Sequence, residues 1–500
     1  MTKTTQTKSS IKGFIWMFFG NAFDNISQFV IIAVLARLLT PEDFGVIGII
    51  LLFVNFSNIF NQMGIGAAIV QMKHITKEHI SLSYTLSIVF GIVIGILFYV
   101  LAPYVGQFFN LDSLEAPIRF FSFFFPLKSF NSVSLSILQR ELKFSAIVKS
   151  HSIAYLLGYG LTAIVLALLG FGLWSLIYGQ LAILIVQTII LLVYTKPRFS
   201  LFNSKKVYKD LLFFGSGYTL DTNFNFFAEN SDNIIVGKFL GATSLGIYSR
   251  AFQFLSLPAS FFGKIYDNVL YPILSSKQDD TEKLSYFYIF SISFCLLVLF
   301  PVSLMLLLNA ELLVRILLGD QWLDVIAPFQ ILIIGFCFRF GTRINKSFLK
   351  SLGLVYKGAL YQFIFASLMI SLCMIGVTYY GIIGVSVAVL IATVANYLQV
   401  AYRIQKLLDF DFKYFLGLHL KTFINYIPLY LITFLTLYYS SNIYVIIAIT
   451  CIVLIPICYL LFKHKNSIFR NEHNTVMFNQ LVDNSPKIVN TVITKLRLKK

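Results

Sequence analysis

Long apolar segments recur along the whole of this sequence, and they constrain its fold more than any other feature. A helix that crosses a bilayer needs about 20 consecutive apolar residues, and each segment is long enough to form one. The segments lie near residues 12–38, 44–70, 80–105, 115–138, 150–169, 173–194, 211–237, 244–270, 284–308, 326–349, 358–379, 382–402, 421–440 and 443–462. They predict an all-α integral membrane protein with about 14 transmembrane helices.

The composition indicates that the bilayer is the main solvent of this chain. Hydrophobic residues make up 58% of the sequence and charged residues only 12%. These proportions exclude a disordered chain, a disulfide scaffold and a soluble enzyme with one membrane anchor. The first apolar segment follows three lysines, as in a signal peptide, but it runs well beyond signal length, so we expect a retained first span.

Lysines and arginines gather in alternate connections between the apolar segments. If the N-terminus lies inside, the outer connections hold only Arg37, Lys238 and Arg315, with Arg119 at a boundary, and nearly all other basic residues are inside. Basic loops stay on the cytoplasmic side, so both termini are predicted to be cytoplasmic. The net charge of +17 is then a topology signal, and no nucleic-acid partner is expected.

An internal repeat relates the two halves of the chain. The sequence LARLLTPEDFG, residues 35–45, has a counterpart in VGKFLGATSLG, residues 236–246, which pairs Arg37 with Lys238 and Gly45 with Gly246. A later match pairs Gly170 with Gly381. The repeat predicts two six-helix lobes related by an axis along the membrane normal. The expected domains are residues 1–200, 201–410, an added helix pair in 411–462, and a basic cytoplasmic tail in 463–500.

Charged residues inside the predicted spans indicate a polar interior. Each would cost about 2.5 to 3.5 kcal/mol if it faced lipid at mid-bilayer. Several of them recur at helical spacing, such as Arg339, Arg343 and Lys346 at i, i+4 and i+7. We interpret these stripes as the walls of a cleft between the lobes. Intramembrane charges also pair simply to neutralise each other, and a pair of Arg250 with Glu229 or Asp232 is the first one expected.

The residue types suggest roles for these charges. Arginine and lysine in a site of low dielectric constant favour phosphate or pyrophosphate, which assigns substrate binding to Arg250, Lys264, Arg339, Arg343 and Lys128. Carboxylates at mid-depth take up Na⁺ or H⁺ or form gating ion pairs, which assigns ion coupling to Asp24, Asp221, Glu229, Asp232 and Asp267. Aromatic side chains such as Phe224 or Tyr248 are candidates for stacking on sugars.

The sequence contains no recognisable catalytic or metal-ligand pattern. The six histidines are dispersed and form no HExxH or similar spacing. We therefore expect no enzyme activity, no bound metal and no cofactor, apart from Na⁺ or H⁺ as a coupling ion.

Four segments resemble the Wzx-type polysaccharide flippases of the multidrug/oligosaccharidyl-lipid/polysaccharide exporter superfamily. The segments are LARLLTPEDFG, QMGIGAAIVQ, NSDNIIVGKFLGATSLGIYSRAFQFLSLP and VLYPILSSKQDD, and the resemblance covers about residues 10–410. It implies a two-lobed transporter that moves undecaprenyl-pyrophosphate-linked oligosaccharide across the bacterial cytoplasmic membrane by alternating access. Asp232, Asn233 and Arg250 match recurring motif positions of that family. A polymerase and glycosyltransferases of the same pathway are the implied partners.

Two other kinds of protein remain possible from the sequence. One is a cation-coupled drug antiporter or a peptidoglycan-precursor flippase of the same superfamily; in a drug antiporter, acids would dominate the cavity. The other is a membrane polysaccharide polymerase or ligase, which usually needs a large outer loop. The longest outer connection here lies near residues 309–325, and its Glu311, Asp320 and Asp324 are interpreted as solvated loop charges.

Overall fold

The computed structural model describes residues 20, 23–62, 65–72, 75–197, 199, 226–256, 281–352 and 354–439, and these ranges contain helices and no strand. The chain divides into two compact units, which are described separately. The first comprises Met1–Gln253, Val314–Val325 and Ala366–Val385, and the second Phe254–Leu313, Ile326–Phe365 and Ser386–Lys500. The predicted domain borders stay a prediction.

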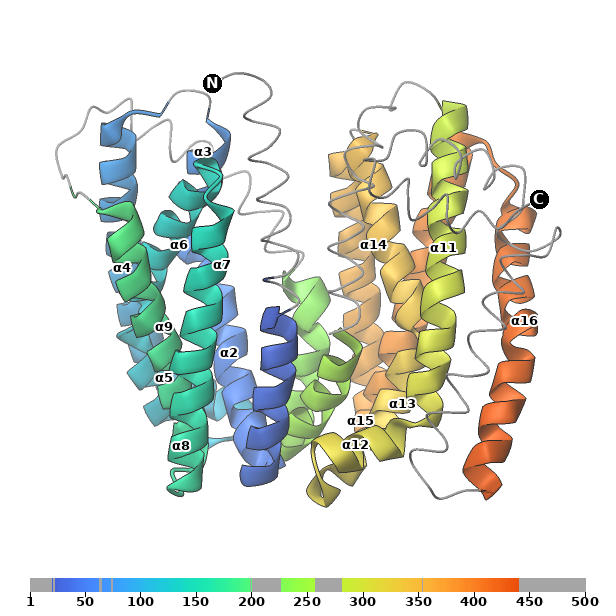
Figure 1. Cartoon of the computed structure of the whole chain (residues 1–500), viewed down its shortest axis with the longest axis horizontal. Helices are drawn as coiled ribbons and strands as arrows, with labels where there is room; N and C mark the ends of the chain where they lie inside the picture. The colour runs from blue at the N-terminus through green and yellow to red at the C-terminus, as the bar shows by residue number, and fades with distance from the viewer. Residues whose placement is uncertain are drawn as a thin grey trace. The chain divides into compact units, whose positions relative to one another are not determined.

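The described helices are shown in chain order by colour in Figure 1. Two helical stretches, residues 23–38 and 226–256, carry no label in the figure. From the N-terminal side, the elements begin with α2 (Pro41–Gln62), α3 (Ile65–Gln71), α4 (Lys77–Phe109), η1 (Asp112–Leu114), α5 (Glu115–Ser122), α6 (Phe125–Arg140), α7 (Phe144–Ile153), the π-helical η2 (Ala154–Leu161), α8 (Thr162–Leu168) and α9 (Leu173–Thr195), of which Figure 1 labels the α-helices. They continue with α11 (Thr281–Leu308), α12 (Ala310–Leu317), η3 (Asp320–Val325), α13 (Ile326–Ile334), α14 (Phe336–Ser351), α15 (Val355–Leu408) and α16 (Phe412–Tyr439).

Several of these helices are long and apolar enough to cross a membrane. Five qualify within the described residues, and a sixth if the pair Asp320–Ile334 and Phe336–Ser351, bent by 47°, is one span. One of them, Leu360–Leu408, has 49 residues, which would extend about 74 Å as a single helix, more than twice the bilayer core. Gly381 interrupts it with φ 57° and ψ −135°, so it contains two passes. The prediction of an all-α, multi-pass membrane protein is confirmed, while the count of 14 stays a prediction.

The TPED sequence of the repeat marks the start of α2. Thr40 lies just before the helix, and its Oγ1 accepts a hydrogen bond from the backbone N–H of Asp43 at 3.2 Å. In return, Asp43 Oδ2 accepts from the backbone N–H of Thr40 at 3.0 Å. This reciprocal capping box, with Pro41 at the first helical position, satisfies N–H groups that have no partner within the helix. The capping of α2 therefore explains the TPED motif.

The paired glycines of the repeat lie at a reciprocal close contact in the first unit. A Cβ added to Gly45 would lie 1.7 Å from the carbonyl oxygen of Ala242, and one added to Gly246 would lie 1.8 Å from that of Pro41. Small residues at such positions let helix backbones touch and form Cα–H···O contacts. The stretch 226–256 is therefore fixed against α2 at a point where no side chain fits.

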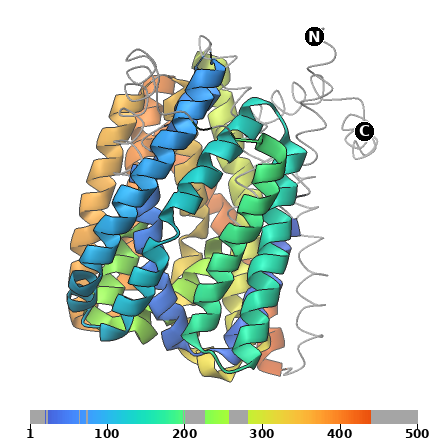
Figure 2. The ribbon, with the colours of Figure 1, turned by 90° about the vertical axis from the view of Figure 1, so that its left-hand side faces the viewer.

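In the rest of the first unit, α4, α5, α6 and α9 pack against their neighbours along their lengths. In Figure 2, α4, α6 and α9 run beside one another, and α5 lies against α4. Asn131 on α6 donates to the Leu184 carbonyl at 3.4 Å and accepts from Thr188 Oγ1 at 2.9 Å, both on α9. The outward face of α4 is lined by exposed Ile92, Val93 and other large apolar side chains, as expected for contact with lipid.

A buried hydrogen-bond chain organises the second unit. Tyr288 on α11 donates to Asn345 Oδ1 on α14 at 2.7 Å, and Asn345 Nδ2 donates to the Tyr397 carbonyl on α15 at 3.1 Å. Tyr397 in turn contacts His419 on α16 through a hydrogen bond of 2.9 Å. These hydrogen bonds link α11, α14, α15 and α16. Each polar group in this hydrogen-bond chain has a partner, as buried polar groups require.

Candidate functional site

Arg250 is held by an aromatic ring in the first unit. Its guanidinium lies 4.6 Å from the ring centroid of Phe44 on α2, and its Nη1 donates to Gln253. Within the described part of the chain, its Nε is buried and has no hydrogen-bond partner. A cation over an aromatic face is stabilised without giving up its donors. Since a guanidinium has five N–H donors, Arg250 keeps several for an anionic ligand.

Two tyrosines of η2, Tyr155 and Tyr159, interact electrostatically with the guanidinium of Arg250. Their ring centroids are 5.4 Å apart. Tyr159 is buried, with 6% of its surface exposed, while Tyr155 is only half-buried. Short π-helical turns are frequent at functional sites. Neither tyrosine was predicted, because the sequence has no signature for such a turn.

Asp24 joins the same helical face from the 23–38 helix. Its Oδ1 accepts a hydrogen bond from Ser152 Oγ at 2.5 Å. Ser152, Tyr155 and Tyr159 are spaced i, i+3 and i+7, which places them along one side of α7 and η2. This face therefore holds a carboxylate that was predicted to lie inside the protein, and its tyrosines interact with a guanidinium of which the same was predicted. We call this cluster the Arg250 site; it comprises Asp24, Ser152, Tyr155, Tyr159, Arg250 and Gln253.

Lys128 on α6 has no polar partner within the described ranges. It is half-buried, and its ammonium makes neither an ion pair nor a hydrogen bond with any residue there. The ion pair of Arg119 with Glu115, by contrast, involves exposed residues. Withdrawing an ammonium from water without a partner is unfavourable, so such a residue in a membrane protein is a candidate for function.

The predicted pairing of Arg250 with Glu229 or Asp232 is wrong. Asp232 is buried, and its Oδ2 accepts from the Tyr248 hydroxyl at 2.7 Å. Its Oδ1 accepts from the backbone N–H of Asn233 at 2.8 Å, while Glu229 is exposed. Left-handed Gly241 (φ +82°) separates Asp232 from Tyr248 and allows the chain to turn between them.

The sugar-stacking prediction for Tyr248 is also wrong. Its side chain is fully buried and its hydroxyl is used by Asp232, so no face of the ring is left for a ligand. The other predicted aromatic residue, Phe224, lies outside the described residues, as do Lys264, Asp221 and Asp267.

Two arginines predicted to bind substrate lie on α14 in the second unit. Arg339, Arg343 and Lys346 are half-buried and share one face, as their spacing predicted. The opposite face carries the buried Ile344 and Phe348. This amphipathic helix presents a stripe of cations and is a second place where anionic groups can bind.

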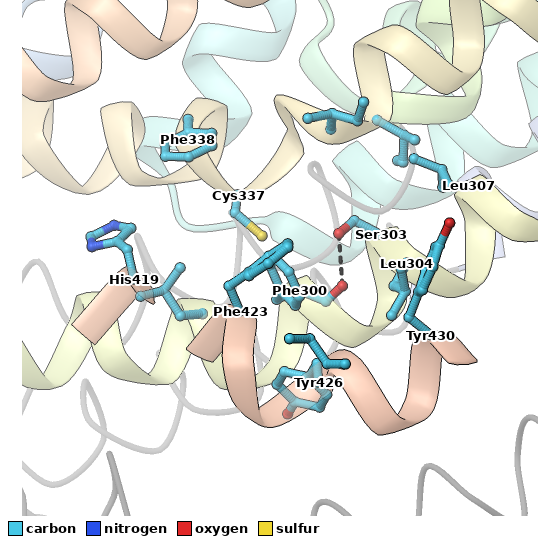
Figure 3. Close-up of a pocket in the computed structure, with 14 residues that line it drawn as sticks. Phe300, Ser303, Leu304, Leu307, Cys337, Phe338, His419, Phe423, Tyr426 and Tyr430 are labelled. Carbon is cyan, nitrogen blue, oxygen red and sulfur yellow. Dashed lines mark hydrogen bonds between the residues drawn. The ribbon is translucent and has the colours of Figure 1, made fainter. Parts of the chain in front are cut away.

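An apolar cavity of 440 Å³ lies among α11, α13, α14 and α16 of the second unit (Figure 3). Phe300, Phe423 and Tyr426 are among its lining residues. The hydroxyl of Ser303 is used internally, since it donates to the Phe300 carbonyl at 2.7 Å. The cavity suits hydrocarbon, and the described residues that line it include His419 but no Asp, Glu, Lys or Arg. In the described part of the chain, no cluster of His, Cys, Asp and Glu could hold a metal ion.

Comparison with known proteins shows similarity along most of the chain. Residues 34–327 match the sequence profile of the family described as polysaccharide biosynthesis protein. An uncharacterized membrane protein in the cps region of Klebsiella pneumoniae is 26% identical over 392 residues, covering 77% of this chain and 80% of that protein. The lipopolysaccharide biosynthesis protein WzxC of Escherichia coli strain K12 is 26% identical over 370 residues, covering 73% and 74%.

Solved structures of similar fold are membrane transporters. The lipid II flippase MurJ in an inward closed conformation aligns with a TM-score of 0.73 at 17% identity, covering 91% of this chain and 99% of that one. An inward-facing multidrug resistance MATE family transporter of the MOP superfamily aligns with a TM-score of 0.61 at 16% identity, covering 77% and 95%. At these identities the likeness establishes the fold alone.

Proposed function

Because the chain belongs to the polysaccharide biosynthesis protein family, we propose that it is a flippase for lipid-linked polysaccharide repeat units. The resemblance to the Wzx-type flippases is confirmed by this family match and by relatives such as WzxC. The observation that carries the proposal is the Arg250 site, where a cation on an aromatic ring keeps donors for an anionic headgroup. Its cargo is a saccharide linked to undecaprenyl pyrophosphate.

The proposed mechanism is alternating access. Two six-helix lobes related by the repeat, with two further helices, enclose a cavity that opens to one leaflet at a time. Arg250, Lys128, Arg339 and Arg343 attract the pyrophosphate or acidic sugars, together with Lys264, while the lipid anchor stays in the bilayer. The proposed location is the bacterial cytoplasmic membrane with both termini inside. Glycosyltransferases supply the cargo, and a polymerase consumes it.

Three rival functions fit the residues less well. A drug antiporter carries cationic cargo, which Lys128 and the α14 stripe of Arg339, Arg343 and Lys346 would repel. A peptidoglycan-precursor flippase would share the pyrophosphate chemistry, and the family membership favours a surface-polymer precursor instead. A polymerase or ligase needs a catalytic set, and the Arg250 site contains a single carboxylate, on Asp24, which gives no acid–base pair.

A vesicle assay tests the proposed function. Purified full-length protein is reconstituted with undecaprenyl-pyrophosphate-linked N-acetylglucosamine carrying a fluorescent label on the sugar, and dithionite is added outside. We expect bleaching to extend beyond the outer leaflet, with protein-free vesicles as the control. Bleaching confined to the outer leaflet, under either an imposed Na⁺ or proton gradient, would contradict the proposal.

Asp24→Asn tests whether the carboxylate couples transport to an ion. Asparagine keeps an oxygen that can accept from Ser152 but removes the negative charge needed to bind Na⁺ or H⁺. We expect transport in the vesicle assay to lose its dependence on the imposed gradient. Glu115→Gln is the matched control, because Glu115 pairs with Arg119 in an exposed ion pair of small energetic value. Gradient dependence retained by Asp24→Asn would assign coupling to another carboxylate.

A further inference from the structure

We propose that Tyr155 is the sugar-binding platform of the flippase, stacking a pyranose ring directly beside the pyrophosphate held by Arg250. The inference rests on the proposed function and deepens it, because it assigns the saccharide, as distinct from the phosphate, to a named side chain. The sequence predicted that Tyr248 stacks on sugars, but this side chain is fully buried. Tyr155 on η2 is only half-buried, so part of its surface is exposed.

Tyr155 lies on a different side of η2 from its most exposed leucines. Leu156, Leu157 and Leu161 are the strongly exposed residues of η2, with up to 59% of their surface accessible, and they mark its lipid-facing side. Tyr155 instead lies on the side that carries Ser152 and Tyr159 and meets the cation of Arg250. A half-buried ring on this side, with Ser152 and the Arg250 guanidinium as polar neighbours, is suited to a hydrophilic ligand.

The ring is rigidly supported. Tyr159 lies behind it with an interplanar angle of 34°. The backbone of η2 is pressed against α9 at Gly158, where an added Cβ would be 2.7 Å from the backbone nitrogen of Ile183. On the other side, a Cβ at Gly160 would be 2.6 Å from Ile31 Cδ1. Because the turn is held from both sides, the aromatic face is preorganised and costs little conformational entropy on binding.

The polar groups around the ring match a sugar phosphate. Tyr159 lies at one end of the face, Tyr155 in the middle, and Ser152 with Asp24 at the other, and both tyrosines interact electrostatically with Arg250. From residue 152 to 159 this face extends roughly 10 Å. Aromatic faces bind the C–H side of a pyranose, and a carboxylate accepts hydrogen bonds from its hydroxyls. The site therefore fits a phosphate followed by one sugar ring.

A binding experiment separates the two parts of the headgroup. The probes are undecaprenyl pyrophosphate, the same lipid carrying N-acetylglucosamine, and the same lipid carrying galactose, each titrated against full-length protein in nanodiscs. The variants are Tyr155→Ala, Tyr155→Phe and Arg250→Ala, each checked for an unchanged thermal midpoint. Tyr104→Ala is the control, since Tyr104 on α4 is 63% exposed among other lipid-facing residues.

We expect Arg250→Ala to weaken all three probes by about tenfold or more, because it removes charge-assisted hydrogen bonds to phosphate. Tyr155→Ala should weaken only the sugar-bearing probes, by roughly tenfold, in line with one aromatic stacking contact. Tyr104→Ala should bind like the wild type, and Tyr155→Phe should recover most of the binding lost in Tyr155→Ala, because phenylalanine keeps the aromatic face. Equal weakening of all probes by Tyr155→Ala, or no weakening, would overturn the assignment. If the wild-type protein bound no probe, or showed no preference for a sugar, the proposed function itself would fail.

Discussion

We expect Lys128→Met to reduce transport by about tenfold or more, which corresponds to at least ~1.4 kcal/mol of lost interaction with the headgroup, while leaving the protein at least as stable as before. Methionine has nearly the length of lysine and removes only the charge. The ammonium has no partner among the described residues, so it contributes no ion pair whose loss would destabilise the fold. An unpaired cation at mid-bilayer costs about 2.5 to 3.5 kcal/mol, and part of this cost is recovered in the variant.

Vesicle transport and the thermal midpoint in detergent measure the two effects together. Lys143→Met is the matched control, because Lys143 is exposed and pairs with Glu141 at 2.7 Å. That variant should change neither quantity much, since exposed ion pairs contribute little. A lower midpoint with undiminished transport in Lys128→Met would show that the lysine stem has a packing role and no part in binding cargo.

The second large effect is expected at Gly45. Gly45→Ala places a methyl group where the Ala242 carbonyl oxygen now lies, at 1.7 Å, so α2 and the 226–256 stretch must separate. Overpacking of this kind costs roughly 1 to 3 kcal/mol, and the Cα–H···O contacts of the crossing are lost as well. The thermal midpoint should fall, and transport should fall with it if the crossing forms in the transport cycle.

Gly48→Ala provides a control on the same helix. A Cβ at Gly48 would lie 3.7 Å from Leu245 Cδ2, which is an ordinary van der Waals contact, so this variant should retain its midpoint and its transport. Gly246→Ala should behave like Gly45→Ala, because it would meet the Pro41 carbonyl in the reciprocal position. Equal midpoints for Gly45→Ala and Gly48→Ala would mean that the crossing is looser than the structure has it.

Parts of the site were predictable because they depend on helical spacing alone. Arg339, Arg343 and Lys346 share a face of α14. Asp24 is half-buried and hydrogen-bonded to Ser152, as expected for a charge that is costly to expose to lipid. The Gly170–Gly381 match of the repeat was less accurate. The backbone of Gly381 (φ 57°, ψ −135°) matches that of Gly172 (φ 51°, ψ −130°), so the turn residues correspond two positions away from the sequence match.

Other parts depended on contacts between distant segments. Arg250 was expected to pair with an acid and instead lies over Phe44, a residue far away in the chain. Asp232 satisfies its oxygens with Tyr248 and Asn233, which leaves it no need of the arginine. Tyr155 and Tyr159 enter the site through a π-helical turn that depends on how η2 is held between its neighbours.

The sequence by itself determined that this chain is a multi-pass membrane protein, and the spans that the structure describes are apolar helices. These properties follow from transfer free energies that add up residue by residue along the chain, so they can be read from local sequence. Only the tertiary structure decided which side chain neutralises which charge and which aromatic ring remains accessible. Those outcomes depend on distances of a few ångströms between helices far apart in sequence, and packing sets such distances collectively.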